Sequence, residues 1–289
     1  MPCTPSPLRY PGGKTKLYKL VRSIIEENNL LHETYIEPFA GGAGLALKLL
    51  INNDVKRIVL NDLDPAIYAF WYCVLNHTEE MCQFVSEVDI TIQEWDRQRE
   101  VYLNQTEHSR VSVAKAVLFL NRTNVSGVIK GGVIGGREQE GAFKIDARFN
   151  RDELVRKIRK ISSLSDRIDL YNLDATEFIS ANILSRYYKV FINFDPPYVD
   201  KGGQLYKNSF TEEDHRHLRN CIAQCRRKWI VTYDVSELVK KLYEKFRGGT
   251  VDIYYSAKDV RKAKEYIFFS NNLTLPANLI SSIEDENAK

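Results

Sequence analysis

The sequence predicts an α/β protein with a doubly wound, mostly parallel sheet, and three features of the chain support this fold class. Strand-like and helix-like runs alternate through residues 1–65 and 161–272, which is the pattern of consecutive βαβ units. A glycine-rich turn follows the first strand-like run, and two prolines follow a later one, so both mark places where the chain leaves a sheet. Residues 66–160 look mainly helical and are interpreted as an inserted domain, whereas residues 273–289 read as a polar tail.

The expected strands are short apolar runs rich in β-branched and aromatic residues, and each is bounded by polar or turn-forming residues. They lie at residues 35–36, 57–60, 168–172, 190–194, 229–233, 251–255 and 266–270. Helices are expected between them, and within the insert at residues 111–120 and 151–160. The carboxyl ends of such strands form the edge at which open α/β sheets bind ligands.

A glycine-rich turn over residues 37–44 joins the first expected strand to an apolar helix. Glycine lets the backbone approach a ligand closely and adopt positive φ, and the start of the helix offers unpaired N–H groups. The next strand ends at Asp62, where an acidic side chain is placed to bind ribose hydroxyls. The unit therefore fits a nucleoside-containing cofactor, although it lacks the G-x-G-x-x-G spacing of a dinucleotide site. An ordinary βαβ unit with a glycine turn is the alternative.

The residues Asp195-Pro196-Pro197-Tyr198 directly follow the strand expected at 190–194. A carboxylate, a carbonyl oxygen in a rigid turn and an aromatic ring together suit a flat base that carries an amino group. Asp195 and the Pro196 carbonyl would accept both N–H groups, and the carboxylate would stabilise the positive charge that develops on the nitrogen during methylation. Tyr198 would stack on a base flipped out of a duplex. The alternative is a capped strand end without a function.

Three further polar positions stand near expected element ends. Lys14 follows two glycines, but residue 8 is Leu where a phosphate-binding loop needs Gly, so Lys14 is interpreted as a point charge for a carboxylate. Asp174 either accepts a hydrogen bond from the adenine of a cofactor or caps the helix that follows. His215 and His217 begin a helix without a nucleophile nearby in the sequence, and we expect them on the surface.

The expected insert carries positive charge that the rest of the chain lacks. Residues 110–160 contain twelve Lys/Arg and five Asp/Glu, so their balance is +7 and the remainder carries 3 − 7 = −4. A basic segment favours contact with phosphates. The alternative is that part of this charge, at 151–160, belongs to a helix face exposed to solvent. Arg122 and Asn124 are residue types that read guanine and adenine edges. The glycine-rich stretch 131–137 is expected to form a hairpin or arm, with phosphate contacts from Lys130, Arg137, Lys144 and Arg148.

The composition limits the class of protein. A hydrophobic content of 44% is ordinary for a globular chain, no apolar run has the length of a membrane span, and the N-terminus lacks a signal-peptide pattern. The five cysteines are irregularly spaced, without the partner ligands of a zinc site, so packing roles are favoured and no metal is expected. A reduced, cytosolic protein is therefore expected.

The motifs, in this order, resemble those of the Dam-like (D12 class) N6-adenine-specific DNA methyltransferases. They are R-Y-P-G-G-K at 9–14, E-P-F-A-G-G-A-G at 37–44, N-D-L-D-P at 61–65, F-L-N-R-T-N at 119–124, F-D-P-P-Y at 194–198 and R-K-A-K-E at 261–265. The resemblance spans about residues 8–270, nearly the whole chain. One departure is the spacing F-x-G-G-x-G at 39–44, where the family usually has F-x-G-x-G.

The resemblance implies a Rossmann-like enzyme that moves a methyl group from S-adenosylmethionine to N6 of a flipped adenine in double-stranded DNA, with residues 66–160 recognising the target. The cofactor residues expected are Tyr10, Lys14, Glu37, Phe39, Ala40, Gly41, Asp62, Leu63, Asp174 and Asp195. Catalysis and base binding are expected at Asp195, Pro196, Pro197 and Tyr198. The candidates for DNA contact are Arg9, Asn121, Arg122, Asn124, Lys130, Arg137 and Lys144.

Two alternatives to this function stay open at the level of the sequence. A related turn serves methylation of cytosine N4 or of a protein amide, although the order of the motifs and the basic insert favour adenine. A DNA-binding regulator could keep the fold without catalysis, but the presence of Lys14, Asp62 and Asp195 argues against it. A monomer suffices for the reaction, and a cytoplasmic location in a bacterial or phage-infected cell is expected. A companion restriction endonuclease is one biological setting among several.

Overall fold

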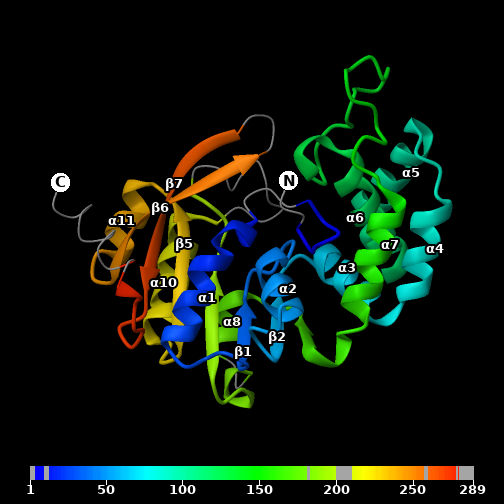
Figure 1. Ribbon diagram of the computed structural model, residues 1–289. Coiled ribbons are helices and arrows are strands. Elements are labelled where there is room, and N and C mark those ends of the chain that lie inside the picture. The colour runs from blue at the N-terminus through cyan, green and yellow to red at the C-terminus, as the bar shows by residue number, and fades with distance from the viewer. Residues whose placement is uncertain are drawn as a thin grey trace.

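The computed structural model describes residues 4–9, 13–180, 183–199, 210–256, 260–277 and 279. Its centre is a 7-stranded sheet with the order β3-β2-β1-β4-β5-β7-β6 (Figure 1). The strands are β1 (Thr34–Glu37), β2 (Arg57–Asn61), β3 (Ile168–Tyr171), β4 (Val190–Phe194), β5 (Lys228–Asp234), β6 (Arg247–Ser256) and β7 (Val260–Phe269). Strands β1 to β5 pair in parallel, and β7 runs antiparallel to both β5 and β6. The expected doubly wound, mostly parallel sheet is confirmed.

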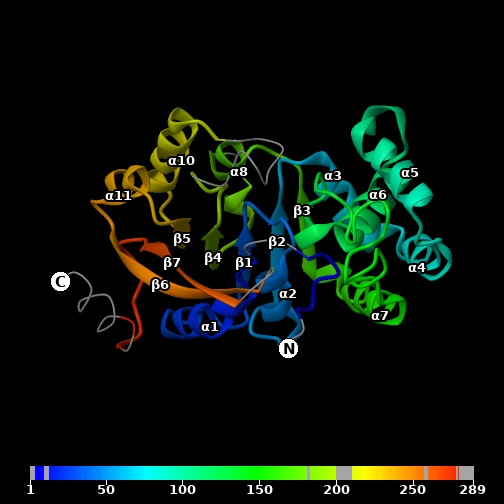
Figure 2. The same cartoon turned by 90° about the horizontal axis from the view of Figure 1, so that it is seen from above.

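Helices cover both faces of the sheet (Figure 2). One face carries α1 (Tyr18–Glu27) and α2 (Gly44–Ile51), and the other carries α8 (Ala175–Ser180), α10 (Glu212–Gln224) and α11 (Glu237–Tyr243). Neighbouring residues of a strand point to opposite faces, so Tyr35 packs in one apolar cluster and Ile36 in the other. The central strands are therefore buried along almost their whole length, as strands covered on both faces are.

A layer of five helices lies beside the β3 edge (Figures 1 and 2). They are α3 (Pro65–Asn76), α4 (Thr78–Glu87), α5 (Ile92–Leu103), α6 (Arg110–Thr123) and α7 (Arg151–Ser162). Helix α6 forms the centre of this layer, because every residue from Ala116 to Thr123 is buried. The helical character expected for residues 66–160 is observed, and a long irregular loop joins α6 to α7.

The parallel register brings three strand ends to the same edge of the sheet. Glu37 of β1 pairs with Leu60 of β2, and Ile36 pairs with Ile192 of β4. Asn61, which is fully buried, donates hydrogen bonds from Nδ2 to the carbonyls of Pro38 and Leu173, at 2.9 and 3.0 Å. One amide thus ties the loops that follow β1 and β3 to the end of β2, which holds the glycine turn in place.

Two expectations about the catalytic half need correction. His215 is buried rather than on the surface, because it lies in the aromatic core and its Nδ1 is 2.9 Å from the Tyr233 hydroxyl. The tail is not polar from its start, since Leu273, Leu275 and Leu279 pack against the core beside α1. In the described part of the chain, none of the helices has both the length and the apolar surface to cross a membrane.

Candidate active site

The glycine turn after β1 is fixed by the end of β2. Asp62 accepts a hydrogen bond at Oδ2 from the Gly41 N–H (2.8 Å) and one at Oδ1 from the Asp64 N–H (3.0 Å). The Gly41 φ of 44° lies in the left-handed region, and its carbonyl accepts from Trp71 Nε1 at 2.9 Å. Burial raises the pKa of Asp62 to about 6. The turn is thus shaped by protein contacts on both sides.

The surface around this turn combines apolar and polar groups. Leu63 is 40% exposed beside the Asp62 carboxylate, and the half-buried ring of Phe39 packs on Phe210 with centroids 6.2 Å apart. An exposed apolar side chain next to a carboxylate fits the two parts of a nucleoside, a flat base and a ribose. Ala40 is buried, with its N–H on the Asn61 carbonyl at 2.9 Å, so it shapes the turn from within.

Glu37 and Asp174 are two further expected cofactor residues whose carboxylates have protein partners. Glu37 is 4% exposed, its Oε1 accepts from the Tyr35 hydroxyl at 3.0 Å, and burial raises its pKa to about 8. A direct contact from Glu37 to a ligand is therefore not supported by this arrangement. Asp174 accepts from the Thr176 N–H at 2.8 Å, so it does cap α8. Its contact with a cofactor adenine stays a prediction.

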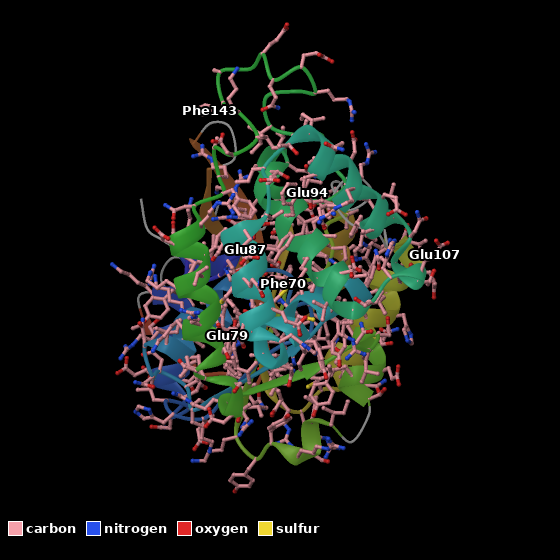
Figure 3. All side chains as sticks on the ribbon, turned by 90° about the vertical axis from the view of Figure 1, so that its right-hand side faces the viewer. Phe70, Glu79, Glu87, Glu94, Glu107 and Phe143 are labelled. Atoms are coloured by element: carbon pink, nitrogen blue, oxygen red, sulfur yellow. The ribbon has the colours of Figure 1, made fainter. Side chains whose placement is uncertain are left out.

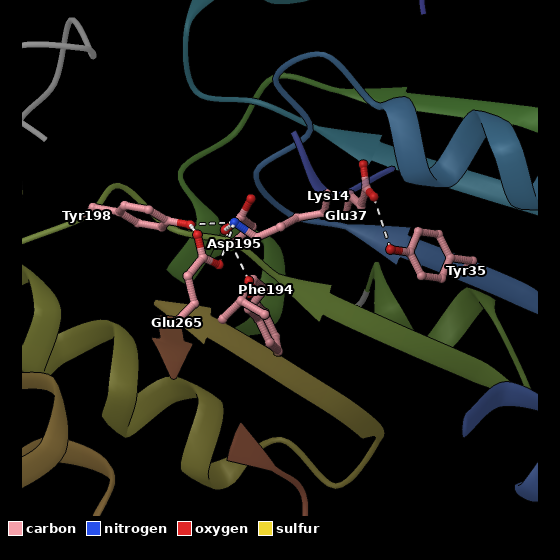
Figure 4. A network of polar contacts seen from close by, with 8 residues as sticks. Lys14, Tyr35, Glu37, Phe194, Asp195, Tyr198 and Glu265 are labelled. Carbon is pink, nitrogen blue, oxygen red and sulfur yellow. Dashed lines mark hydrogen bonds and ion pairs between the residues drawn. The ribbon is translucent and has the colours of Figure 1, made fainter. Parts of the chain in front are cut away.

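In the turn that follows β4, one carboxylate oxygen of Asp195 is held by protein contacts (Figure 4). Oδ1 lies 2.9 Å from Lys14 Nζ and accepts from Thr232 Oγ1 at 3.0 Å. The Asp195 side chain is 24% exposed, while that of Lys14 is 3% exposed. A carboxylate that is held at one oxygen and partly exposed to solvent can accept a hydrogen bond from a bound base without reorganising.

Lys14 and Tyr198 meet a second carboxylate, which comes from β7 (Figure 4). Glu265 Oε2 is 3.1 Å from Lys14 Nζ, and Oε1 accepts from the Tyr198 hydroxyl at 2.5 Å. Lys14 also donates to the Tyr198 hydroxyl. Burial lowers the pKa of Lys14, but Asp195 and Glu265 together outweigh it, so the pKa is raised and the ammonium stays charged. Burial raises the pKa of Glu265, against the opposing effect of Lys14.

The asparagines expected to read DNA bases are instead used inside the protein. Asn121 donates to the carbonyls of Arg9 and Gly127, both at 2.8 Å, and accepts from the Arg9 N–H at 2.7 Å. Asn124 accepts from Trp95 Nε1 at 2.6 Å and donates to two carbonyls of the following loop. Both are fully buried. The expected base contacts of Asn121 and Asn124 do not fit this structure, because their polar atoms already have partners.

The other candidates for DNA contact differ in how far they reach solvent. Arg122 is 7% exposed, so a base contact from it is not supported either. Arg9 is half-buried, and its Nη1 lies 3.2 Å from the Asn124 carbonyl. The pKa of Arg9 is lowered mainly by burial and, to a smaller extent, by the positive charge of Arg148. Lys130, Arg137 and Lys144 are exposed on the loop between α6 and α7, and Arg137 pairs with Asp96 at 2.7 Å.

Sequence reasoning missed how directly two residues of the site act on the catalytic turn. Glu265 ends the R-K-A-K-E motif, but nothing in the sequence indicates that Thr232 binds Asp195 or that Glu265 binds Tyr198. Glu265 reaches the turn because it pairs with Asp234 across β5 and β7, and this pairing becomes known only from the fold. Tyr10, another expected cofactor residue, lies outside the described residues. No group of three or more metal-binding side chains is found among the described residues.

The fold and the site together define the class of protein. A seven-stranded sheet of this topology, with a glycine turn and an acid at adjacent strand ends, is that of a Rossmann-like, S-adenosylmethionine-dependent methyltransferase. The model of one family, described as the D12 class N6 adenine-specific DNA methyltransferases, matches residues 10–259. The chain belongs to this family and is a DNA adenine methyltransferase that uses S-adenosylmethionine.

Individual relatives are more distant. The chain is 21% identical over 227 residues to Type II methyltransferase M.MjaIII of Methanocaldococcus jannaschii, covering 72% of this chain and 73% of that protein. It is 23% identical over 240 residues to Type II methyltransferase M.CviBI of Paramecium bursaria Chlorella virus NC1A, covering 82% and 85%. A putative RNA methyltransferase from Pyrococcus horikoshii, known as a crystal structure, gives a TM-score of 0.40 at 12% identity, covering 88% of this chain and 79% of that one.

Proposed function

We propose that this enzyme methylates one adenine within a short duplex sequence, and that the flipped base is held by Asp195, Pro196 and Tyr198. The observation that carries the proposal is the Asp195 carboxylate, whose Oδ1 is held by Lys14 and Thr232 while the side chain keeps 24% exposure. Oδ2 is then placed to accept one N–H of the adenine amino group, and the Pro196 carbonyl accepts the other.

The chemistry follows from these two acceptors. The N6 lone pair of adenine is delocalised into the ring, and two acceptors on its hydrogens draw it back toward the nitrogen. S-adenosylmethionine supplies the methyl group on a positively charged sulfur. Asp195 stabilises the positive charge that the nitrogen gains and is placed to take the proton that it then loses. Tyr198 stacks on the base, for which its ring, 9% exposed here, has to become more accessible.

The cofactor is proposed to lie over the glycine turn between the ends of β1 and β2. Asp62 would accept from the ribose, and Leu63 and Phe39 would contact the adenine ring. The exposure of Leu63 and the half-exposed ring of Phe39 support this placement, since both border the Gly41 turn that Asp62 anchors. Asp174, with Oδ1 on the backbone of α8, would meet the cofactor adenine through its other oxygen.

The DNA is proposed to bind along the loop that joins α6 to α7. This loop rises above the helical layer, and Figure 3 shows Phe143 near its upper part. Phe143 is 62% exposed beside the Arg148 guanidinium, which lies 5.4 Å from the ring centroid. Lys130, Arg137 and Lys144 are exposed on the same loop. Together they offer phosphate contacts and one apolar surface, which is the composition of a target-recognition segment.

The proposed cellular setting follows from the names of the relatives and from the substrate. Both curated relatives are named type II methyltransferases, which supports a role beside a restriction endonuclease. A monomer that modifies each strand in a separate encounter suffices, and a cytoplasmic location in bacterial or phage-infected cells fits a DNA substrate.

The experiment that tests the proposal is long-read methylation sequencing of DNA from cells that express the wild-type chain or Asp195→Ala. We expect N6-methyladenine in one short motif with the wild-type chain and none with the variant. Methylation of cytosine N4, methylation without a motif, or an unchanged pattern in the variant would each contradict the proposal. The exposed Glu244→Gln variant serves as the control and is expected to give the wild-type pattern.

A further inference from the structure

The catalytic turn is held by side chains from β5, which pairs with β4, and from β7, which pairs with β5. Thr232 and Asp234 are two residues apart on β5, so both project from the same face of the sheet. Thr232 Oγ1 donates to Asp195 Oδ1 at 3.0 Å, and Asp234 Oδ1 accepts from the Val199 N–H at 3.2 Å. Glu265 stands opposite Asp234 in the antiparallel register of β5 and β7, and such partners share a face.

Glu265 completes this set by reaching the one residue of the turn that has an aromatic ring. Its Oε1 accepts from the Tyr198 hydroxyl at 2.5 Å, and its Oε2 lies 3.1 Å from Lys14 Nζ. The same ammonium is 2.9 Å from Asp195 Oδ1. Glu265 therefore contacts both the Tyr198 hydroxyl and the Lys14 ammonium that holds Asp195, while the Glu265 side chain is 2% exposed.

The charges of this cluster also matter. One ammonium is shared between two carboxylates, so Lys14, Asp195 and Glu265 together carry one negative charge. A nitrogen that becomes positive during methylation is favoured beside such a cluster. Without the Glu265 charge, Lys14 would be neutralised by Asp195 alone, and the cluster would carry no net charge. The ammonium would then draw the Asp195 carboxylate more strongly and weaken it as an acceptor.

We propose that Glu265 is a positioning residue for the methyl transfer, which sets the placement of Tyr198 directly and that of Asp195 through Lys14. This inference rests on the proposed function of Asp195 and Tyr198. It adds the β6–β7 hairpin, which follows the parallel part of the sheet, to the machinery that places the target base. Glu265 does not touch the reacting atoms in this proposal.

The test uses Glu265→Gln, Tyr198→Phe and the double variant, with Glu244→Gln as the matched control on an exposed position. Glu265→Gln keeps the shape but removes the charge, and it should lower the single-turnover rate of methyl transfer about 100-fold with the KM for S-adenosylmethionine changed less than about threefold. Tyr198→Phe keeps the stacking ring and every charge, and it should lower the rate about tenfold. Since both act through one contact, the double variant should fall within about twofold of Glu265→Gln.

Three results would overturn the proposal. They are a Glu265→Gln rate within about twofold of wild type, additive effects of the two substitutions, or a loss confined to cofactor affinity. If Glu265→Gln does not fold, as judged by circular dichroism, then Tyr198→Phe alone decides, and an unchanged rate contradicts the proposal. Fluorescence of 2-aminopurine at the target position reports base placement apart from chemistry, and Glu265→Gln should reduce it. Inactivity of the wild-type chain on DNA would instead contradict the proposed function.

Discussion

Two segments of this molecule look alike in sequence and differ in what their polar atoms do. Asp195 follows an apolar strand, and Asn121 to Asn124 end an apolar helix. Asp195 keeps one anchored oxygen and 24% exposure, whereas the amides of Asn121 and Asn124 are fully buried and bound to the protein. A polar residue at the end of an apolar element therefore indicates a binding site only where the fold leaves one of its polar atoms accessible.

The largest change in stability is expected at the Asp195 site, from the substitution Lys14→Met. This change removes the cation that two carboxylates share, and Lys14 and Glu265 are both almost fully buried. The free energy of unfolding should fall by about 3 to 5 kcal/mol, because a buried charge is left without its partner. Urea unfolding measures this, with the exposed Lys245→Met as the control. A loss below about 1 kcal/mol would mean that the charge cluster does not form in solution.

The next effect concerns the helix end, where Asn124→Ala leaves the Trp95 N–H and two carbonyls without their partner. A loss of about 3 kcal/mol in unfolding free energy is expected, since each unsatisfied buried group costs about 1 kcal/mol or more. The exposed Asn271→Ala should change stability by less than about 0.5 kcal/mol. If Asn124→Ala kept full stability but relaxed the DNA sequence preference, Asn124 would be a base-reading residue and the comparison would fail.

These two segments also show how far the sequence predicts the molecule. A strand was expected at the place of each of the seven, because buried strands contain continuous apolar runs, but the charged first half of β7 (Val260–Phe269) was not predicted. Asp195 was predictable for the same reason, as was the glycine turn with Asp62. The role of Glu265 was not, because its contact with Tyr198 spans 67 residues and depends on the antiparallel return of β7. The base contact predicted for Asn124 was wrong, because Asn124 is buried against Trp95 of a neighbouring helix, which the sequence does not indicate.

A third, smaller effect is the pH dependence of stability that Glu37, the buried acid on β1, should cause. The pKa of Glu37 is raised by burial from 4.5 to about 8, so the folded protein keeps a proton that the unfolded chain has released. Stability should therefore fall as the pH rises between about 4.5 and 8, by at most about 1.4 kcal/mol per pH unit from this group. Thermal unfolding of wild type and Glu37→Gln across this range measures it. Equal slopes for both proteins would show that Glu37 is ionised when folded.

The smallest effect is expected on the DNA surface, from Lys130→Ala. Lys130 is exposed on the loop between α6 and α7, so its removal should cost one phosphate contact and leave the fold unchanged. The slope of log binding constant against log salt concentration should become less steep by about 0.9. Lys245→Ala, in the exposed turn that follows α11, is the control. An unchanged slope for Lys130→Ala would place the DNA elsewhere.

The measurement that tests the central claim most directly is single-turnover methyl transfer by Asp195→Asn on a duplex that contains the methylated motif. Asparagine keeps the size of the side chain and an oxygen acceptor but removes the charge and offers an N–H group. We expect the rate to fall about 1,000-fold, while the affinity for S-adenosylmethionine, measured by calorimetry, changes less than about tenfold. A rate within about tenfold of wild type would contradict the account, because the accessible carboxylate oxygen of Asp195 would then not be the group that activates the adenine amino group.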